Sequence, residues 1–169
     1  MSVFFLDETI PSDLHEIHIT VDAKNTEHFI DVCNQNSIKP IVIALGKSYL
    51  DPMTSHRYQG SIQGAEDEIT RLVQILGSAI PPIPVIRIKA ETTVSNPIVL
   101  ADTGYYESHL SIVVPESDEA RLRYFVGTIK ELHLSSNAMK TSNAVKSIMA
   151  TYRARRVTAD KFTADKQIV

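Results

Sequence analysis

The sequence predicts an α+β fold, either ferredoxin-like or a duplicated βαβ sandwich, with helices on one face of a mostly antiparallel sheet and a polar groove on the other. Three observations predict this fold. Strand-like and helical segments follow one another in the order β-α-β-α-β-β-α-β. Three strand-like segments alternate polar and apolar residues, so each has one polar and one apolar side. The stretch that begins at His18 also resembles the stretch that begins at His109, which suggests a weak internal duplication.

The first half of the chain is predicted to contain two strands and two helices. The first strand covers about 16–22, and a helix follows at about 25–36 with Phe29, Val32 and Cys33 on its buried side. An unbroken apolar run at 41–45 predicts a strand that is buried on both sides. Residues 46–60 have no periodicity, so we expect a long loop there. Residues 63–76 have apolar residues at helical spacing and predict the second helix.

The second half is predicted to contain three strands and a helix. Prolines at 81, 82 and 84 precede a strand at 85–92, and a loop at 95–104 leads to a strand at 105–114. Ser117 is a candidate N-cap for a helix that extends to about 132, with Leu122, Phe125, Val126 and Ile129 facing inward. A final strand is expected at about 147–153.

The composition predicts one compact domain over residues 1–154 and a polar tail over residues 155–169. The chain has 169 residues, of which 43% are hydrophobic and 22% are charged, as is typical of soluble globular proteins. Its formal charge of −3 gives no general attraction to nucleic acid, so we expect no stable binding to a duplex. The oligomeric state is left open by the sequence.

The single cysteine, Cys33, indicates a reducing compartment, because it provides neither a disulfide framework nor a cysteine metal cage. No apolar run in the sequence is long enough to cross a bilayer, and the first residues lack the features of a signal peptide. We therefore expect a cytoplasmic protein without a membrane partner.

Two of the strand-like segments place a histidine beside a hydroxyl on the polar side. Residues two apart in a strand project from the same face, so His18 lies beside Thr20, and His109 lies beside Ser111. The strand at 85–92 adds Arg87 and Lys89 on its own polar side. If the three apolar sides pack in one sheet, the opposite face gathers all of these groups. An antiparallel sheet with one face in water gives the same alternation without any function, so this interpretation also stays open.

Two facing histidines are suited to general acid–base chemistry, because an imidazole gains and loses a proton near neutral pH. The hydroxyls of Thr20 and Ser111 are candidates to bind phosphate oxygens. Arg87 or Lys89 would offset the charge that builds up in the transition state. This chemistry requires neither a metal nor another cofactor. His18 and His109 are therefore the candidate catalytic residues.

The segments 18–21 (His-Ile-Thr-Val) and 109–112 (His-Leu-Ser-Ile) resemble the paired motifs of the two-histidine (2H) phosphoesterase superfamily. The resemblance implies duplicated α+β lobes with one such motif in each lobe. It also implies that His18 and His109 are the catalytic pair, and that Thr20 and Ser111 bind the phosphate of a 2′,3′-cyclic or 2′-5′-linked substrate. In the familiar members the second motif comes after the last long helix, whereas here a predicted helix follows His109.

A second resemblance is to a group of uncharacterised microbial and viral proteins, and it implies no activity. It rests on segments 53–55, 87–89, 105–109 and 133–137, and it suggests further site residues, which are Glu107, His133, Ser135 and Asn137. His133 is then an alternative partner for His109, or a structural residue near the end of a helix, where a positive imidazole is favourable. In the expected loop at 46–60, Thr54, Ser55, His56 and Arg57 are candidates for a flap over a bound anion, and a plain surface loop is the alternative.

The sequence therefore favours a metal-independent phosphodiesterase that acts on a cyclic phosphate or a short oligonucleotide. The alternative is a non-catalytic module that holds a nucleotide or another small phosphorylated ligand on the same polar sheet face. A third possibility is a structural or host-interaction protein whose polar face is merely hydrated.

Overall fold

A computed structural model describes residues 3–4, 13–45, 49–93, 105–139 and 145–154 of the chain. Its contacts divide the chain into two compact units. We call residues 9–96 the His18 unit, and residues 1–8 together with 97–169 the His109 unit. The prediction of one domain over residues 1–154 stays a prediction. The predicted loop at 95–104 and the predicted tail at 155–169 lie outside the described residues.

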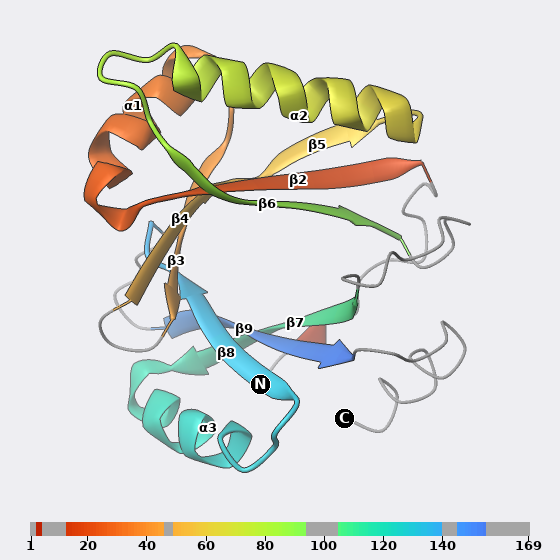
Figure 1. The fold of residues 1–169 in the computed structure, drawn as a ribbon. Helices are drawn as coiled ribbons and strands as arrows, with labels where there is room; N and C mark the ends of the chain where they lie inside the picture. Colours follow the sequence, from red (N-terminus) through yellow and green to blue (C-terminus); the bar gives the residue numbers. More distant parts are fainter. Residues whose placement is uncertain (1–2, 5–12, 46–48, 94–104, 140–144, 155–169) are drawn as a thin grey trace. The chain divides into compact units, whose positions relative to one another are not determined.

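Both units combine antiparallel strands with helices, which confirms the predicted α+β class (Figure 1). The elements of the His18 unit are β2 (Leu14–Val21), η1 (Ala23–Asn25), α1 (Thr26–Gln35), β3 (Pro40–Leu45), β4 (Tyr49–Thr54), β5 (His56–Gln59), α2 (Ile62–Gly77) and β6 (Val85–Thr92). The elements of the His109 unit are β1 (Val3–Phe4), β7 (Tyr106–Pro115), η2 (Glu116–Asp118), α3 (Glu119–Val126), β8 (Leu132–Asn137) and β9 (Val145–Ala154).

The strands of the His18 unit have the ferredoxin-like order. β2 pairs with β6 on one side and with β4 and β5 on the other, and β4 in turn pairs with β3; all of these pairs are antiparallel. The strands β4 and β5 share one register along β2, because Thr20 faces Met53 and Ile17 faces His56. Taken as one strand, they give the chain order β-α-β-β-α-β.

The apolar side of β2 forms the core of the His18 unit with α1 and α2. Both helices lie on the same side of β2 and β5 (Figure 1), and Ile17 and Ile19 of β2 are fully buried there. The core residues are Ile17, Ile19, Val21, Phe29, Val32, Cys33, Ile38, Leu72, Leu76 and Ile83. The prediction that Phe29, Val32 and Cys33 form the buried side of the first helix is therefore confirmed.

The boundaries of the two helices follow from local capping and packing. Asp22 accepts a hydrogen bond from the Lys24 backbone N–H at 3.0 Å and thereby starts the turn that precedes α1. Ser61 caps α2 by accepting from the Gly64 N–H at 3.1 Å. Gly64 lies close to Tyr58, since a Cβ there would be 1.9 Å from the Tyr58 hydroxyl oxygen and the Tyr58 side chain would have to move.

The prediction of a long loop at 46–60 is wrong, because β4 and β5 occupy most of this segment. Periodicity is absent from β4 because Asp51–Thr54 are buried one after another. Thr54 is fully buried, and its hydroxyl accepts from the Ile19 backbone N–H and donates to the Ile17 carbonyl, both at 2.9 Å. Thr54 thus connects β4 to β2 and does not belong to a flap.

Two further expectations about strands of the His18 unit are wrong. Val42 is the buried residue of β3, and its neighbours are only partly buried, so β3 is not buried on both sides. The apolar side of β6 is also open, with Ile86 63% exposed and Ile88 47% exposed. The reason is that α1 packs on β3 and β4, whereas α2 packs on β2 and β5.

The His109 unit repeats part of this architecture. Its strand order is β1-β7-β9-β8, and all neighbours are antiparallel. The helix α3 lies on the apolar side, where Ile112, Val114, Ile148 and Ala150 form the core with Leu122 and Leu134 packed against it. The predicted third helix is too long, because α3 ends before Gly127 and residues 132–137 form β8. Phe125, expected to face inward, is 64% exposed.

The internal duplication is visible as a repeated topology. In each unit a histidine strand is followed by a 3₁₀ turn, a helix and two antiparallel strands, and the last of these pairs with the histidine strand. β1 pairs with β7 on its remaining side, which is the position that β6 has beside β2. Each unit therefore presents its histidine from a strand with neighbours on both sides. Within the described residues, no helix is long and apolar enough to cross a membrane.

Candidate functional site

The polar sides of β2, β4, β5 and β6 form one continuous surface, which we call the His18 row. Opposite residues in neighbouring strands share a face, and Glu16 faces Glu91, His18 faces Lys89 and Thr20 faces Arg87. On the other side of β2, Glu16 faces Arg57, and the same register brings Ser55 beside His18. The row consists of Glu16, His18, Thr20, Asp51, Ser55, Arg57, Arg87, Lys89 and Glu91.

The ring of His18 is fixed by a backbone carbonyl. Its Nδ1 lies 2.8 Å from the carbonyl oxygen of Thr54, and a carbonyl only accepts, so Nδ1 carries a proton. Nε2 then faces Glu91, with Oε2 at 3.4 Å, and Glu16, with Oε1 at 4.0 Å. The side chain of His18 is 11% exposed. The ring thus presents its second nitrogen to the polar surface.

The surroundings of His18 favour its protonated form. Burial lowers its pKa, but the hydrogen bonds to Glu91 and to the Thr54 carbonyl, together with the charge of Glu91, raise it by more. Lys89 opposes this increase, and the resulting pKa remains above the usual value of 6.5. The imidazolium form, which can donate a proton from Nε2, is therefore favoured at mildly acid pH.

Arg87 and Thr20 lie together at one end of the row. The Nη2 of Arg87 is 2.6 Å from Oδ2 of the buried Asp51, and it also donates to the Thr20 hydroxyl at 3.1 Å. Arg87 is held by Asp51 while 54% of its side chain stays exposed. Both residues are on the face that the sequence predicts, and the Thr20 hydroxyl still has a proton to donate.

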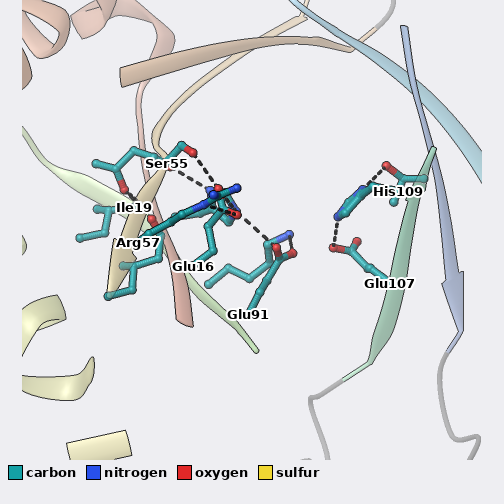
Figure 2. A network of polar contacts seen from close by, with 12 residues as sticks. Glu16, Ile19, Ser55, Arg57, Glu91, Glu107 and His109 are labelled. Carbon is teal, nitrogen blue, oxygen red and sulfur yellow. Dashed lines mark hydrogen bonds and ion pairs between the residues drawn. The ribbon is translucent and has the colours of Figure 1, made fainter. Parts of the chain in front are cut away.

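Glu16 lies between His18 and Arg57 at the other end of the row. Figure 2 shows Glu16 beside Ser55 and Arg57. Its Oε1 accepts from the Ser55 hydroxyl at 2.7 Å, and its Oε2 lies 3.8 Å from Nε of Arg57. Lys89 forms an ion pair with Glu91. The carboxylates of the row, Glu16, Asp51 and Glu91, are matched by Arg57, Arg87 and Lys89. Protonation of His18 consequently gives the row a net positive charge.

The polar sides of β7, β9 and β8 form the corresponding His109 row. His109 faces Thr151, which faces His133 on the next strand. Glu107 faces Arg153. Ser111 faces Met149, which faces Ser135. The row consists of Glu107, His109, Ser111, His133, Ser135, Asn137, Ser147, Met149, Thr151 and Arg153. Five residues that the sequence predicts for the site, Glu107, His109, Ser111, His133 and Ser135, are thus in one register.

His109 is held by side chains and not by a backbone carbonyl. Its Nδ1 lies 3.0 Å from the hydroxyl oxygen of Thr151, and its Nε2 lies 3.8 Å from Oε2 of Glu107 (Figure 2). Glu107 is 7% exposed, and its Oε1 accepts from Nε of Arg153 at 2.7 Å. The Arg153 guanidinium lies 4.6 Å from the centre of the Tyr105 ring. Glu107 therefore connects Arg153 to His109, as Glu16 connects Arg57 to His18.

Three other predicted residues of the His109 unit differ in their contacts. His133 lies in β8, so its interpretation as a residue near a helix C-terminus is wrong. Asn137 ends β8, and its Oδ1 accepts from the Met139 backbone N–H at 2.9 Å, which closes the following turn. Ser111 lies 3.3 Å from Ser147, oxygen to oxygen.

Sequence reasoning does not place Arg153 and Thr151 in the site, and it places Ser55 only in the candidate flap of the expected loop at 46–60. A signal for them exists in the sequence, because β4–β5 and β9 share the pattern Met-x-Ser/Thr-x-Arg, at 53–57 and at 149–153. The histidine strands share the pattern Glu-x-His-x-Thr/Ser, at 16–20 and at 107–111. The two patterns are paired in the same register in both units.

Glu16, His18 and Glu91 bring one ligand atom each within 4.8 Å of one another, which is compatible with a bound cation. Their carboxylates already interact with Ser55, Arg57 and Lys89. This arrangement is an ion-paired network on the sheet surface.

No protein-family model and no curated protein matches the chain. The two repeated rows are therefore the features of the molecule from which we infer a function. His18 and His109 belong to different units, so their pairing stays a prediction. His133 lies in the same unit as His109, with Thr151 of β9 between them, and its pairing with His109 also stays a prediction.

Proposed function

We propose that the protein is a metal-independent phosphodiesterase that acts on a cyclic phosphate or a short oligonucleotide, with His18 and His109 as its acid–base pair. The observation that supports the proposal is the repeat itself. Each unit presents a histidine from a strand that has neighbours on both sides, with a glutamate two residues before it and a hydroxyl two residues after it. An arginine and a second hydroxyl come from the adjacent strand. Duplicated acid–base groups of this kind suit a reaction with two proton transfers.

The environments of the two histidines suggest which is the acid. The imidazolium form of His18 is favoured, and its Nε2 carries the proton to be donated. His109 is then the base. Its Nε2 takes a proton from the attacking water, a new P–O bond forms, and the bond to the leaving oxygen breaks as His18 protonates that oxygen. Each positioned proton transfer contributes about 10²–10⁴-fold to the rate.

Hydroxyl and cationic residues of the two rows would bind the phosphate. The Thr20 and Ser111 hydroxyls can donate to its oxygens, and Arg87 and Lys89 supply positive charge on the His18 side. Ser135 and His133 lie on the corresponding side of β8. We expect the reaction to occur in the cytoplasm, on a small phosphorylated substrate.

The test is a hydrolysis screen against cyclic mononucleotides, cyclic dinucleotides and short oligonucleotides, with a chelator present throughout. We expect turnover with a bell-shaped pH profile that is lost in His18→Ala and in His109→Ala. His28→Ala is the matched control, because His28 lies on α1 outside both rows and contacts the Pro81 carbonyl. Hydrolysis that persists in both row variants would overturn the proposal, and His133→Ala shows whether His133 replaces His18.

A non-catalytic module for a nucleotide or another phosphorylated ligand is the second candidate. The observation that favours it is Arg87, which Asp51 holds in place while 54% of its side chain stays exposed, so that its other N–H groups can bind an anion without any reaction. Binding of a nucleotide without any product after long incubation would select this candidate.

A further inference from the structure

We infer that Arg57 and Arg153 are an equivalent pair of phosphate-binding residues, one in each unit, and that Arg153 makes the larger contribution. The inference rests on the proposed phosphate chemistry of the same two rows, and it adds Arg153 to the predicted site residues. Three features support it, which are the strand register of the two arginines, the contacts that hold each guanidinium, and the other charges in each row.

The register makes the two arginines equivalent. Arg57 lies opposite Glu16, two positions along the ladder from His18, and Arg153 lies opposite Glu107, two positions from His109. Side chains two positions apart along one face of a ladder are neighbours. Each arginine therefore lies diagonally across the ladder from the histidine of its own row.

The anchoring is also repeated. A guanidinium has five N–H donors in a rigid plane, so one carboxylate can hold it while other donors bind a second anion. Glu107 takes Nε and Nη2 of Arg153, at 2.7 and 2.5 Å, and the ring of Tyr105 packs against the guanidinium plane. Arg57 is held more loosely, with Nε 3.8 Å from Glu16, and its side chain is 71% exposed. Arg153 is 37% exposed and is thus the more closely held of the two.

The charges explain why the contributions differ. The His18 row contains Arg87 and Lys89 in addition to Arg57. On the polar sides of β7, β8 and β9, as far as these strands are described, Arg153 is the one arginine or lysine. It also offsets Glu107, whose carboxylate would otherwise repel an anion beside His109. Phosphate binding at the His109 row therefore depends on Arg153.

The experiment is a titration of the full-length protein with inorganic phosphate, followed by NMR of the histidine ring resonances. We expect Arg153→Ala to weaken phosphate binding by about 10–100-fold, because a hydrogen bond to a charged group is lost. Arg57→Ala should weaken it by only about 2–10-fold, since neighbouring cations remain. Arg153→Lys keeps the charge and should retain part of the affinity, and it covers the case in which Arg153→Ala fails to fold after losing its ion pair with Glu107.

Arg123→Ala is the matched control, because Arg123 forms an equivalent ion pair with Glu119 on α3, outside the row. The inference is overturned if the wild-type protein binds no phosphate, if Arg153→Ala binds as the wild type does, or if Arg123→Ala weakens binding equally. Weakened binding in Arg153→Ala combined with no ester hydrolysis by the wild type would keep this inference and remove the phosphodiesterase. Ester hydrolysis by the wild type combined with unchanged phosphate binding in Arg153→Ala would keep the phosphodiesterase and remove this inference.

Discussion

The His18 and His109 rows share a pattern of residues but differ in what surrounds their histidines. His18 is 11% exposed and bonded to a backbone carbonyl, whereas His109 is 34% exposed and bonded to the Thr151 hydroxyl. A carbonyl fixes which nitrogen carries the proton, but a hydroxyl can donate or accept. A repeated motif can therefore supply two histidines with different chemical roles.

The difference originates in the strand next to each histidine. Thr54 and Ala150 occupy equivalent positions, opposite Ile19 and Leu110. The Thr54 hydroxyl makes hydrogen bonds to the backbone of β2, and its carbonyl is thereby directed to His18. Ala150 has no such hydroxyl, and β7 and β9 form a regular ladder.

The largest expected effect tests whether the two rows act together. We expect His18→Ala and His109→Ala each to lower kcat by about 10²–10⁴-fold, and the double variant to be little worse than the more damaging single one, because residues that act as a unit are non-additive. Steady-state kinetics on the best substrate of the screen measure this. Effects that multiply in the double variant would indicate two independent rows.

An intermediate effect tests the role of Thr54. Thr54→Val keeps the shape but leaves the Ile19 N–H and the Ile17 carbonyl without the buried hydroxyl, so we expect a loss of about 1–3 kcal/mol in the free energy of unfolding. Denaturant unfolding monitored by circular dichroism gives this value. Thr54→Ser should recover most of it. Thr70→Val, at an exposed α2 position, should change stability little, and an equal loss there would contradict the assignment.

The smallest effect concerns pH. The pKa of His18 is raised on folding, so protonated His18 stabilises the fold fully below pH 6.5, and this contribution is lost as pH rises through the folded-state pKa. The stability difference between wild type and His18→Gln should therefore shrink with rising pH. Glu91→Gln should lower the His18 pKa in an NMR titration, whereas Glu27→Gln, on α1, should leave it unchanged. A pKa unaffected by Glu91→Gln would contradict the described environment.

The sequence predicts the fold well where one side of an element is buried and the other is polar. The alternation around His18 and the spacing of Leu72 and Leu76 lead directly to β2 and α2. The signal fails in β4, because Asp51–Thr54 are buried consecutively and show no period. The prediction also fails for β8. The predicted helix continues past Gly127, where α3 has ended, to residue 132, where β8 begins.

The candidate site was only partly predictable for a related reason. His18, Thr20, His109 and Ser111 follow from alternation within one strand. Arg153 and Thr151 reach the site through strand pairing, which connects residues distant in sequence. Strand pairing becomes readable only when the second repeated pattern, Met-x-Ser/Thr-x-Arg, is compared between the two halves.

The most direct measurement is the number of phosphate ions bound per chain, determined by calorimetry and by NMR of both histidine rings. If the two rows serve one ester, a single phosphate should shift the resonances of His18 and His109 with the same dissociation constant, and either alanine variant should abolish the shift of the remaining ring. Two phosphates bound with separate constants, each shifting one ring, would contradict the account.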